Sequence, residues 1–371
     1  MELLRDWFRR SFSDPQVVIL GLFLVVGLAI VVGLGTWLAP MFASIVIAYL
    51  LEAIVERLQR MGVPRLPAVI LVFLLFITIL LFLFFGLVPL VSRQLTQLVQ
   101  QFPSYITTGQ ELLRQLPAAY PQLVSEEQIE DLIGQVGQEV ASLGQQVVGW
   151  SLASVASVIG LAVYLVLLPV LVFFFLKDKD LMIGWISARL PQERSLANRV
   201  WSESEAQIAN YVRGKVLEIF IVGAVTWVTF MLLDLQYAAL LATMIGFSVL
   251  VPYIGAAVAT IPVAIVAYFQ FGWGWDFGQV MIAYAVIQAL DGNLLVPLMF
   301  SEVVNLHPVA IILAILVFGG IWGFWGIFFA IPLATLVKAV INAWPKKQEA
   351  SGEGGGEVAA EAVDAGEGDR G

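Results

Sequence analysis

The segment GQVMIAYAVIQALDGNLLVPLMF, residues 278–300, is long and apolar enough to cross a membrane, yet it carries an aspartate, Asp291, in its interior. It belongs to a stretch, residues 216–337, that contains no lysine or arginine. A carboxylate among apolar helices is costly in lipid, so it usually faces the protein interior or a water-filled path. These residues predict a helical membrane protein and make Asp291 the first candidate for its function.

The rest of the chain has the same apolar character. Only 13% of its 371 residues are charged, whereas a soluble domain has about 25%. Runs of about 18 or more apolar residues recur, and the alternating ten-residue pattern of a membrane β-barrel does not. We therefore predict an all-α polytopic membrane protein with about eight transmembrane spans, some of them discontinuous helices.

Composition divides the chain into segments of different character. Polar residues interleaved at helical spacing mark amphipathic helices outside the membrane, and a Gly/Glu/Ala-rich end predicts disorder. The predicted segments are a cytoplasmic lead (1–16), transmembrane spans (17–92), an extracytoplasmic amphipathic helical insert (93–150), a further span (151–176), cytoplasmic amphipathic helices (177–215), a transmembrane transport core (216–345) and a disordered acidic tail (346–371).

The placement of Lys and Arg predicts the orientation, because cytoplasmic loops carry an excess of these residues. An eight-span arrangement with both termini cytoplasmic puts every basic segment inside and the insert outside. The segment 237–270 leaves an alternative open, since Pro252 and Pro262 interrupt it. If that segment enters the membrane and returns, the number of crossings after it changes. Glu218 and Asp234, near the ends of their span, are expected at the membrane interface.

The sequence around Asp291 predicts an ion or solute path. Gly292 and Pro297 can loosen or end the helix and free backbone carbonyls, and Asn293 adds a polar amide. Transporters commonly place their sites at discontinuous helices at membrane depth, where a carboxylate would suit reversible proton binding. The structural alternative is that Asp291 caps a helix end or pairs with Asn293.

Two further polar groups are weaker candidates. Pro252 and Gly255 predict a helix break beside Tyr253, for which a static kink is the alternative. Glu302 and His307 lie in a polar connector that could border the path or be purely interfacial. His307 is the only histidine and the chain has no cysteine, so we expect no metal site. No catalytic, cofactor or nucleic-acid motif is present in the sequence, so we expect neither an enzyme nor a cofactor.

Four motifs in this order resemble the autoinducer-2 exporter family, the PerM-like permeases. They are FFFLKD (173–178), YVRGK (211–215), VPYIG (251–255) and the run from LDGNLLVP to INAWP (290–345). The resemblance implies a multi-pass protein of the bacterial inner membrane, assembled as a homo-oligomer. It also implies secondary transport, of autoinducer-2 in some members and of sodium and protons in others.

Two functions of different classes follow from these observations. The first is a secondary transporter that exports a small solute or exchanges cations such as sodium for protons, with Asp291 as the carrier. The alternative is a non-transporting membrane scaffold whose helices outside the membrane recruit partner proteins. A passive channel is a third reading, disfavoured because no ring-forming polar filter stands out. In each case the lipid bilayer is the environment, and nucleic acid is not a partner.

Overall fold

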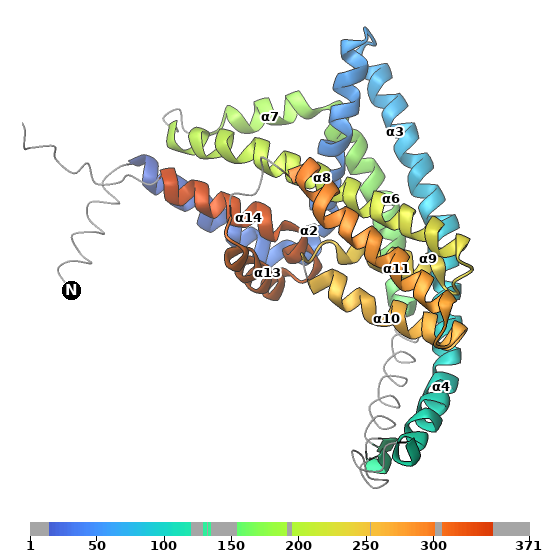
Figure 1. The fold of residues 1–371 in the computed structure, drawn as a ribbon. Coiled ribbons are helices and arrows are strands. Elements are labelled where there is room, and N and C mark those ends of the chain that lie inside the picture. Colours follow the sequence, from blue (N-terminus) through green and yellow to red (C-terminus); the bar gives the residue numbers. More distant parts are fainter. Residues whose placement is uncertain are drawn as a thin grey trace, which may run out of the picture.

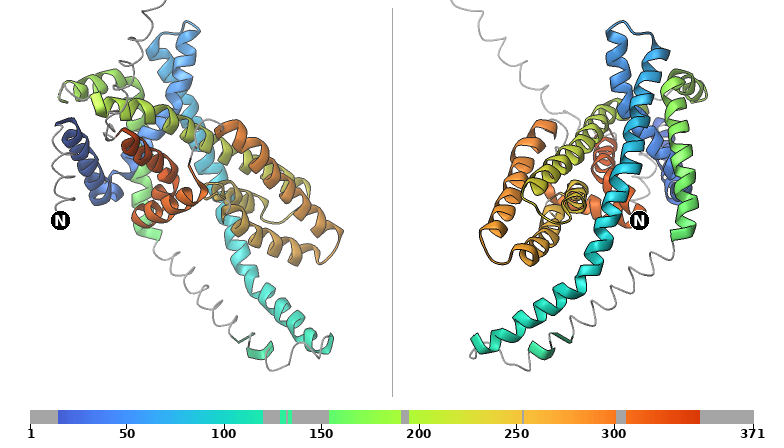
Figure 2. Two further views of the ribbon diagram at one scale, coloured as in Figure 1. Left: turned by 60° about the vertical axis from the view of Figure 1, so that its left-hand side comes forward. Right: turned by 90° about the vertical axis from the view of Figure 1, so that its right-hand side faces the viewer.

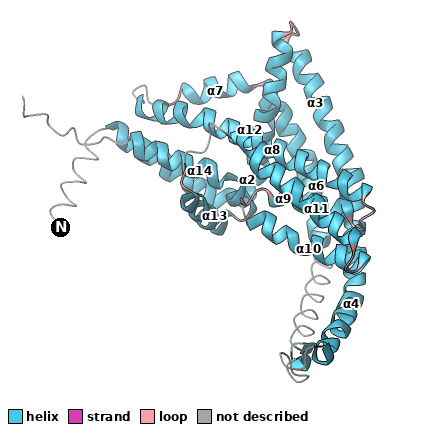
Figure 3. Cartoon of the chain, viewed as in Figure 1, coloured by secondary structure: helices cyan, strands magenta, loops and turns pink. Residues whose placement is uncertain are grey.

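The structure is a computed structural model and describes residues 15–119, 129–131, 133–134, 154–190, 195–252, 254–300 and 306–343. Every regular element within these residues is a helix, as Figure 3 shows. Six of the helices in this part of the chain are long and apolar enough to cross a membrane, and shorter apolar helices accompany them. The predicted all-α polytopic membrane fold is confirmed. The acidic tail and much of the outer insert lie outside the described residues.

The first group of helices consists of α2 (Pro15–Arg60), α3 (Arg65–Phe82) and α6 (Ser154–Lys177). Helix α2 passes through Pro40 without ending, and its two halves run in different directions in Figure 1. A proline inside a helix removes one hydrogen bond and crowds the preceding turn, which accounts for a bend. The second half of α2 packs on α3 and α6 through small apolar side chains, which include Ala48, Val55, Val69, Val72 and Val172.

Helix α3 continues without a break into the region predicted to lie outside the membrane. A five-residue π-helix, η1 (Leu83–Leu87), leads directly into α4 (Val88–Ala119). Figure 2 shows the three elements as one long curved helix that extends past the rest of the described chain. The predicted boundary at residue 93 is therefore a change of composition within a helix, and the beginning of the insert is a continuation of a span.

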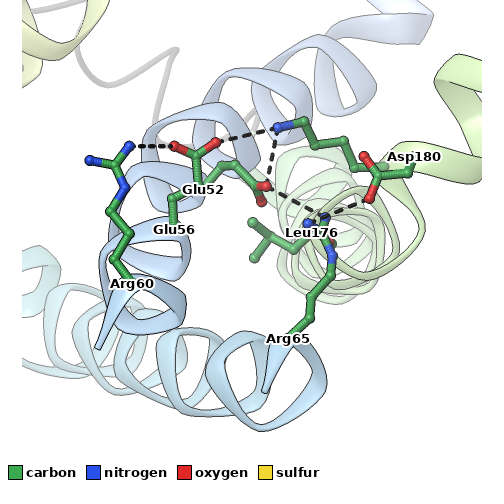
Figure 4. A network of polar contacts seen from close by, with 7 residues as sticks. Glu52, Glu56, Arg60, Arg65, Leu176 and Asp180 are labelled. Atoms are coloured by element: carbon green, nitrogen blue, oxygen red, sulfur yellow. Dashed lines mark hydrogen bonds and ion pairs between the residues drawn. The ribbon is translucent and has the colours of Figure 1, made fainter. Parts of the chain in front are cut away.

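A network of charges joins the ends of this first group of helices to α7 (Lys179–Ser187). Glu52 of α2 is buried, and its Oε1 atom lies 3.1 Å from Lys179 Nζ and 3.4 Å from Arg65 Nη2 (Figure 4). The same guanidinium donates to the backbone oxygen of Leu176 at 3.1 Å. Glu52 thus links α2 to α3 and α7, and Arg65 extends the network to α6.

The second group is built on α8 (Ser195–Leu232), which packs against α9 (Ala238–Ser248). The two backbones come close at one point, where a β-carbon on Gly246 would lie 2.9 Å from the backbone oxygen of Ile219. Helix α9 has 11 residues and so extends only about 16 Å, too short to cross about 30 Å of hydrocarbon. It is followed by α10 (Ile254–Phe271).

Helices α9 and α10 form a hairpin, because the end of α10 lies beside the beginning of α9. Gln270 Nε2 donates to the backbone oxygen of Asp234 at 2.7 Å, and its Oε1 accepts from the backbone N–H of Gln236 at 2.7 Å. At the other end, the chain turns between Ser248 and Ile254 through Pro252. Gly255 is required there, since a β-carbon would overlap the backbone of Ser248.

This hairpin corresponds to the alternative that the sequence left open for residues 237–270. The eight-span arrangement had residues 237–270 run as one segment, whereas the structure folds them back so that Gln270 lies beside Asp234 and Gln236. From there α11 (Trp275–Leu290) runs back, and it continues through the π-helix η2 (Asp291–Leu295) into α12 (Val296–Phe300). If this hairpin enters the membrane and returns, the crossings after residue 237 take the other of the two orders that the sequence left open.

A second hairpin lies at the C-terminal end of the described chain. Helices α13 (Pro308–Trp322) and α14 (Phe324–Ala343) are joined by Gly323 alone, whose φ of 59° suits glycine. They pack closely, because a β-carbon on Gly326 would overlap the backbone of Phe318.

This arrangement predicts the sidedness of two exposed residues, Asp276 and His307. Because the natural chain has no cysteine, single cysteines can be introduced and labelled with a membrane-impermeant maleimide. Asp276→Cys should react from the same side as Gln115→Cys in α4, and His307→Cys from the opposite side. A straight crossing of residues 237–270 predicts the reverse for both positions, so that result would contradict the first hairpin.

Candidate functional site

The central feature of the site is a buried ion pair on α8. Lys215 Nζ lies 2.8 Å from Glu218 Oε2, and the two residues are only 4% and 1% exposed. Residues three apart lie on the same face of a helix, so the pair forms within one turn. Two charges removed from water are costly unless they are paired with good geometry. The pair therefore keeps charge in the interior of an otherwise apolar helix.

Asp291 brings a second carboxylate to this pair from α11 and η2. It is 8% exposed, and its charge interacts with those of Lys215 and Glu218. At a rise of about 1.5 Å per residue, Glu218 and Asp291 both lie about 20–25 Å from the Leu232 and Trp275 ends of their helices. Figure 1 shows α8 and α11 running along each other, and contacts join α8 to both α11 and η2. The two acids thus lie at similar depth in adjacent helices.

Asp291 is also the first residue of the π-helix. Val296 N–H donates to the backbone oxygen of Asp291, five residues earlier, in place of the usual four. Pro297, the next residue, has no N–H to donate to Asn293, so a wider turn is accommodated here. The sequence predicted that Gly292 and Pro297 loosen or end the helix. The structure keeps the helix continuous and widens it by one residue at the buried acid.

Two polar atoms on this face have hydrogen-bonding capacity left. Asp291 Oδ1 and Gln288 Nε2 are buried, and neither makes a hydrogen bond with another described residue. They lie three residues apart and therefore on one face of the helix. A buried acceptor and a buried donor without partners cost free energy. A bound proton, cation or polar solute group would remove that cost.

The structure separates Asn293 from Asp291. Asn293 is exposed, and its Nδ2 donates to the backbone oxygen of Ala289 at 2.8 Å. It therefore satisfies its own helix, and Gly292 lies on the same exposed side. Within the described residues no hydrogen bond joins the two polar side chains, so the structural pairing considered for Asp291 and Asn293 is not formed.

The other predicted positions lie away from this cluster or outside the description. His307 is exposed and forms the N-cap of α13, where its Nδ1 accepts from Val309 N–H at 3.3 Å. Pro252 and Gly255 lie in the turn and first residues of the α9–α10 hairpin. Tyr253 and Glu302 fall outside the described residues. Among the residues that the structure describes, no three metal-ligating side chains come together.

Glu218 was expected at the membrane interface from its position in the sequence. The structure buries it and brings it to Asp291. One signal was present in the sequence, since Lys215 precedes Glu218 by three residues and that spacing is typical of a helical ion pair. No local sequence pattern indicates that Asp291, distant in sequence, lies near Glu218.

The cluster predicts a large effect of removing its only lysine. Lys215→Met leaves two buried carboxylates without a neighbouring cation, and breaking a buried pair in this way costs about 3–5 kcal/mol. Adding Glu218→Gln should recover most of that loss. Thermal unfolding in detergent tests this, with Lys177→Met as a control, since Lys177 forms only a half-exposed pair with Asp178. Equal stability of the two single variants would contradict the account.

Comparison with known proteins agrees with the fold and with the motifs. The sequence profile described as AI-2E family transporter matches residues 19–346. PerM of Escherichia coli K12, named as a permease, is 48% identical over 348 residues, covering 94% of this chain and 99% of its own. YueF of Bacillus subtilis, named as a transport protein, is 25% identical and covers 83% of this chain and 84% of its own. The chain belongs to the AI-2E transporter family.

Proposed function

We propose that this protein is a secondary transporter that exchanges cations for protons or exports a small solute, with Asp291 as the group that binds the proton or cation. The observation that carries the proposal is the position of Asp291. Its buried carboxylate lies on a π-helix that packs against α8, the helix that carries the buried Glu218, and one of its oxygens makes no hydrogen bond with a described residue. Intramembrane acids in such positions commonly mark ion or solute pathways.

Charge balance supports an exchange. Lys215 compensates one of the two carboxylates, so the ionised cluster has one negative charge left over. Uncompensated charge is costly at low dielectric constant, and either a proton or a monovalent cation would neutralise it. The two would compete for the same oxygen atoms. This competition is the physical requirement for antiport, and it predicts one positive charge bound per cluster.

Similarity supports transport without identifying the solute. Relatives along nearly the whole chain are named as a permease and as a transport protein. The family description makes autoinducer-2 the first organic solute to test. We propose that the protein lies in the bacterial inner membrane with both termini cytoplasmic. In support of a cytoplasmic side, the basic residues Arg60, Arg65 and Lys179 lie together at one end of the helices. Assembly as a homo-oligomer rests on the family resemblance alone.

Asp291→Asn should abolish coupled proton movement. The amide keeps the shape of the side chain but has no charge to neutralise, so protons and cations would no longer compete there. Pure protein in proteoliposomes with an internal pH dye, pulsed with sodium or lithium, measures the effect. Asp276→Asn is the control, because Asp276 is an exposed acid in the first turn of the same helix.

The result also separates the transporter from the scaffold. Wild-type proton movement that is lost only in Asp291→Asn supports cation–proton exchange. Full activity of Asp291→Asn would remove this residue from the mechanism. Silence of the wild type would exclude exchange with these cations, and uptake of labelled solutes would then be measured. A scaffold predicts no transport of any solute, and loss of cellular function on deletion within residues 93–150.

A further inference from the structure

A cleft lined almost wholly by glutamine lies where α4 passes the turn between α8 and α9. Its volume is about 360 Å³, which is within the range of small-molecule sites. Helix α4 supplies four of the lining residues at helical spacing, and the turn supplies the rest. The residues are Gln94, Gln97, Gln100, Gln101, Gln236 and Tyr237. None of these side chains is charged, so the cleft is polar and formally neutral.

Internal hydrogen bonds fix the direction of two of the glutamines. Gln94 Oε1 accepts from the backbone N–H of Leu240 at 2.8 Å. Gln101 Oε1 accepts from Tyr237 OH at 2.7 Å and from Tyr105 OH at 3.2 Å. Both carbonyl oxygens are therefore used by the protein itself. Each amide nitrogen still has two N–H donors, which gives the cleft an excess of donors.

The beginning of α9 adds to this character. Tyr237, its N-cap residue, has a left-handed backbone with φ of 58° and a side chain that is 6% exposed. Its hydroxyl is held by Gln101, so the turn is fixed against α4. The N-terminal end of a helix carries a partial positive charge from its free N–H groups. The cleft thus combines amide donors with the partial positive charge at the N-terminal end of α9, which favours oxygen atoms of a ligand.

Three of the lining side chains are left for a ligand. Gln97, Gln100 and Gln236 are exposed, and their side chains form no hydrogen bond within the described part of the chain. Gln94 and Gln101 make the hydrogen bonds that hold α4 to α9. Gln97, Gln100 and Gln236 take no part in that contact. The three additional amides are therefore available to a ligand, which would replace the water at their N–H groups.

We propose that this glutamine cleft binds a small oxygen-rich solute, one that presents hydroxyl, carbonyl or carboxylate oxygens to the amide donors. An apolar solute would leave those donors unsatisfied, and a cation would meet an excess of donors. The cleft lies at the Leu232 end of α8, about 20–25 Å along the helix from the Glu218 and Asp291 cluster. Figure 2 shows α4 extending beyond the end of α10 at this place.

The proposal rests on the proposed function only in treating the bound solute as cargo, and binding can be tested without transport. The probes are ribose and ribonate, which share hydroxyl groups and differ by one carboxylate. Full-length protein in nanodiscs is titrated with each probe by isothermal calorimetry. Wild-type protein should bind at least one probe with a Kd in the millimolar range or tighter. A preference for ribonate would show that the cleft recognises a carboxylate, and equal binding would show that it recognises the hydroxyl groups that the two probes share.

The variant Gln97→Leu/Gln100→Leu should weaken binding by about tenfold or more, since each lost hydrogen bond contributes roughly that factor or somewhat less. Gln110→Leu, on the same helix but outside the cleft, should bind like wild type. The unfolding temperatures of both variants should equal that of the wild type, so that a weaker affinity reflects the cleft and not a loss of folding. Failure of the wild type to bind either probe, or equal binding by the double variant, would overturn the proposal. Both outcomes leave proton coupling at Asp291 unaffected.

Discussion

The buried pair between Lys215 and Glu218 is the interaction on which the central helix depends. Helix α8 contacts α2, α9, α11, α12 and α14, so charges on its buried faces must be neutralised by their neighbours. Lys215 neutralises Glu218 within one turn, so the negative charge of Asp291, across the interface, is left uncompensated when it is ionised. This shared electrostatic environment couples α8 to the segment that contains the π-helix. A change of charge at Asp291 therefore alters the contact between α8 and the segment formed by α11 and η2.

The two hairpins follow from a related constraint. Backbone groups freed at a helix break inside a membrane must be satisfied by protein or by water in a cavity. In the first hairpin Gly255 lets the chain turn against Ser248, and Gln270 closes the open end against Asp234. In the second, Gly323 makes the turn and Gly326 permits close packing. The hairpins leave the polar glutamine cleft at one end of α8 and the acid cluster deeper along it.

Much of the fold was predictable because the signals are local. Apolar length predicted the membrane helices, and an acid within residues 278–300 marked Asp291. The direction of α9 and α10 was not predictable, because both are apolar throughout and the contacts that decide it join Gln270 to residues distant in sequence. Glu218 was missed for the same reason, since its local pattern shows only a pair with Lys215. In the sequence the glutamines of α4 read as the polar face of an amphipathic helix. Only the structure shows that Tyr237, distant in sequence, packs against them.

The central claim is that Asp291 exchanges a proton for a cation, and infrared difference spectroscopy tests it most directly. Protein in lipid bilayers is compared before and after sodium is added, for wild type and Asp291→Asn. The account predicts that a protonated-carboxyl C=O band is lost and a carboxylate band appears in the wild type, with neither change in the variant. A sodium-insensitive spectrum, or the same change in Asp291→Asn, would contradict it.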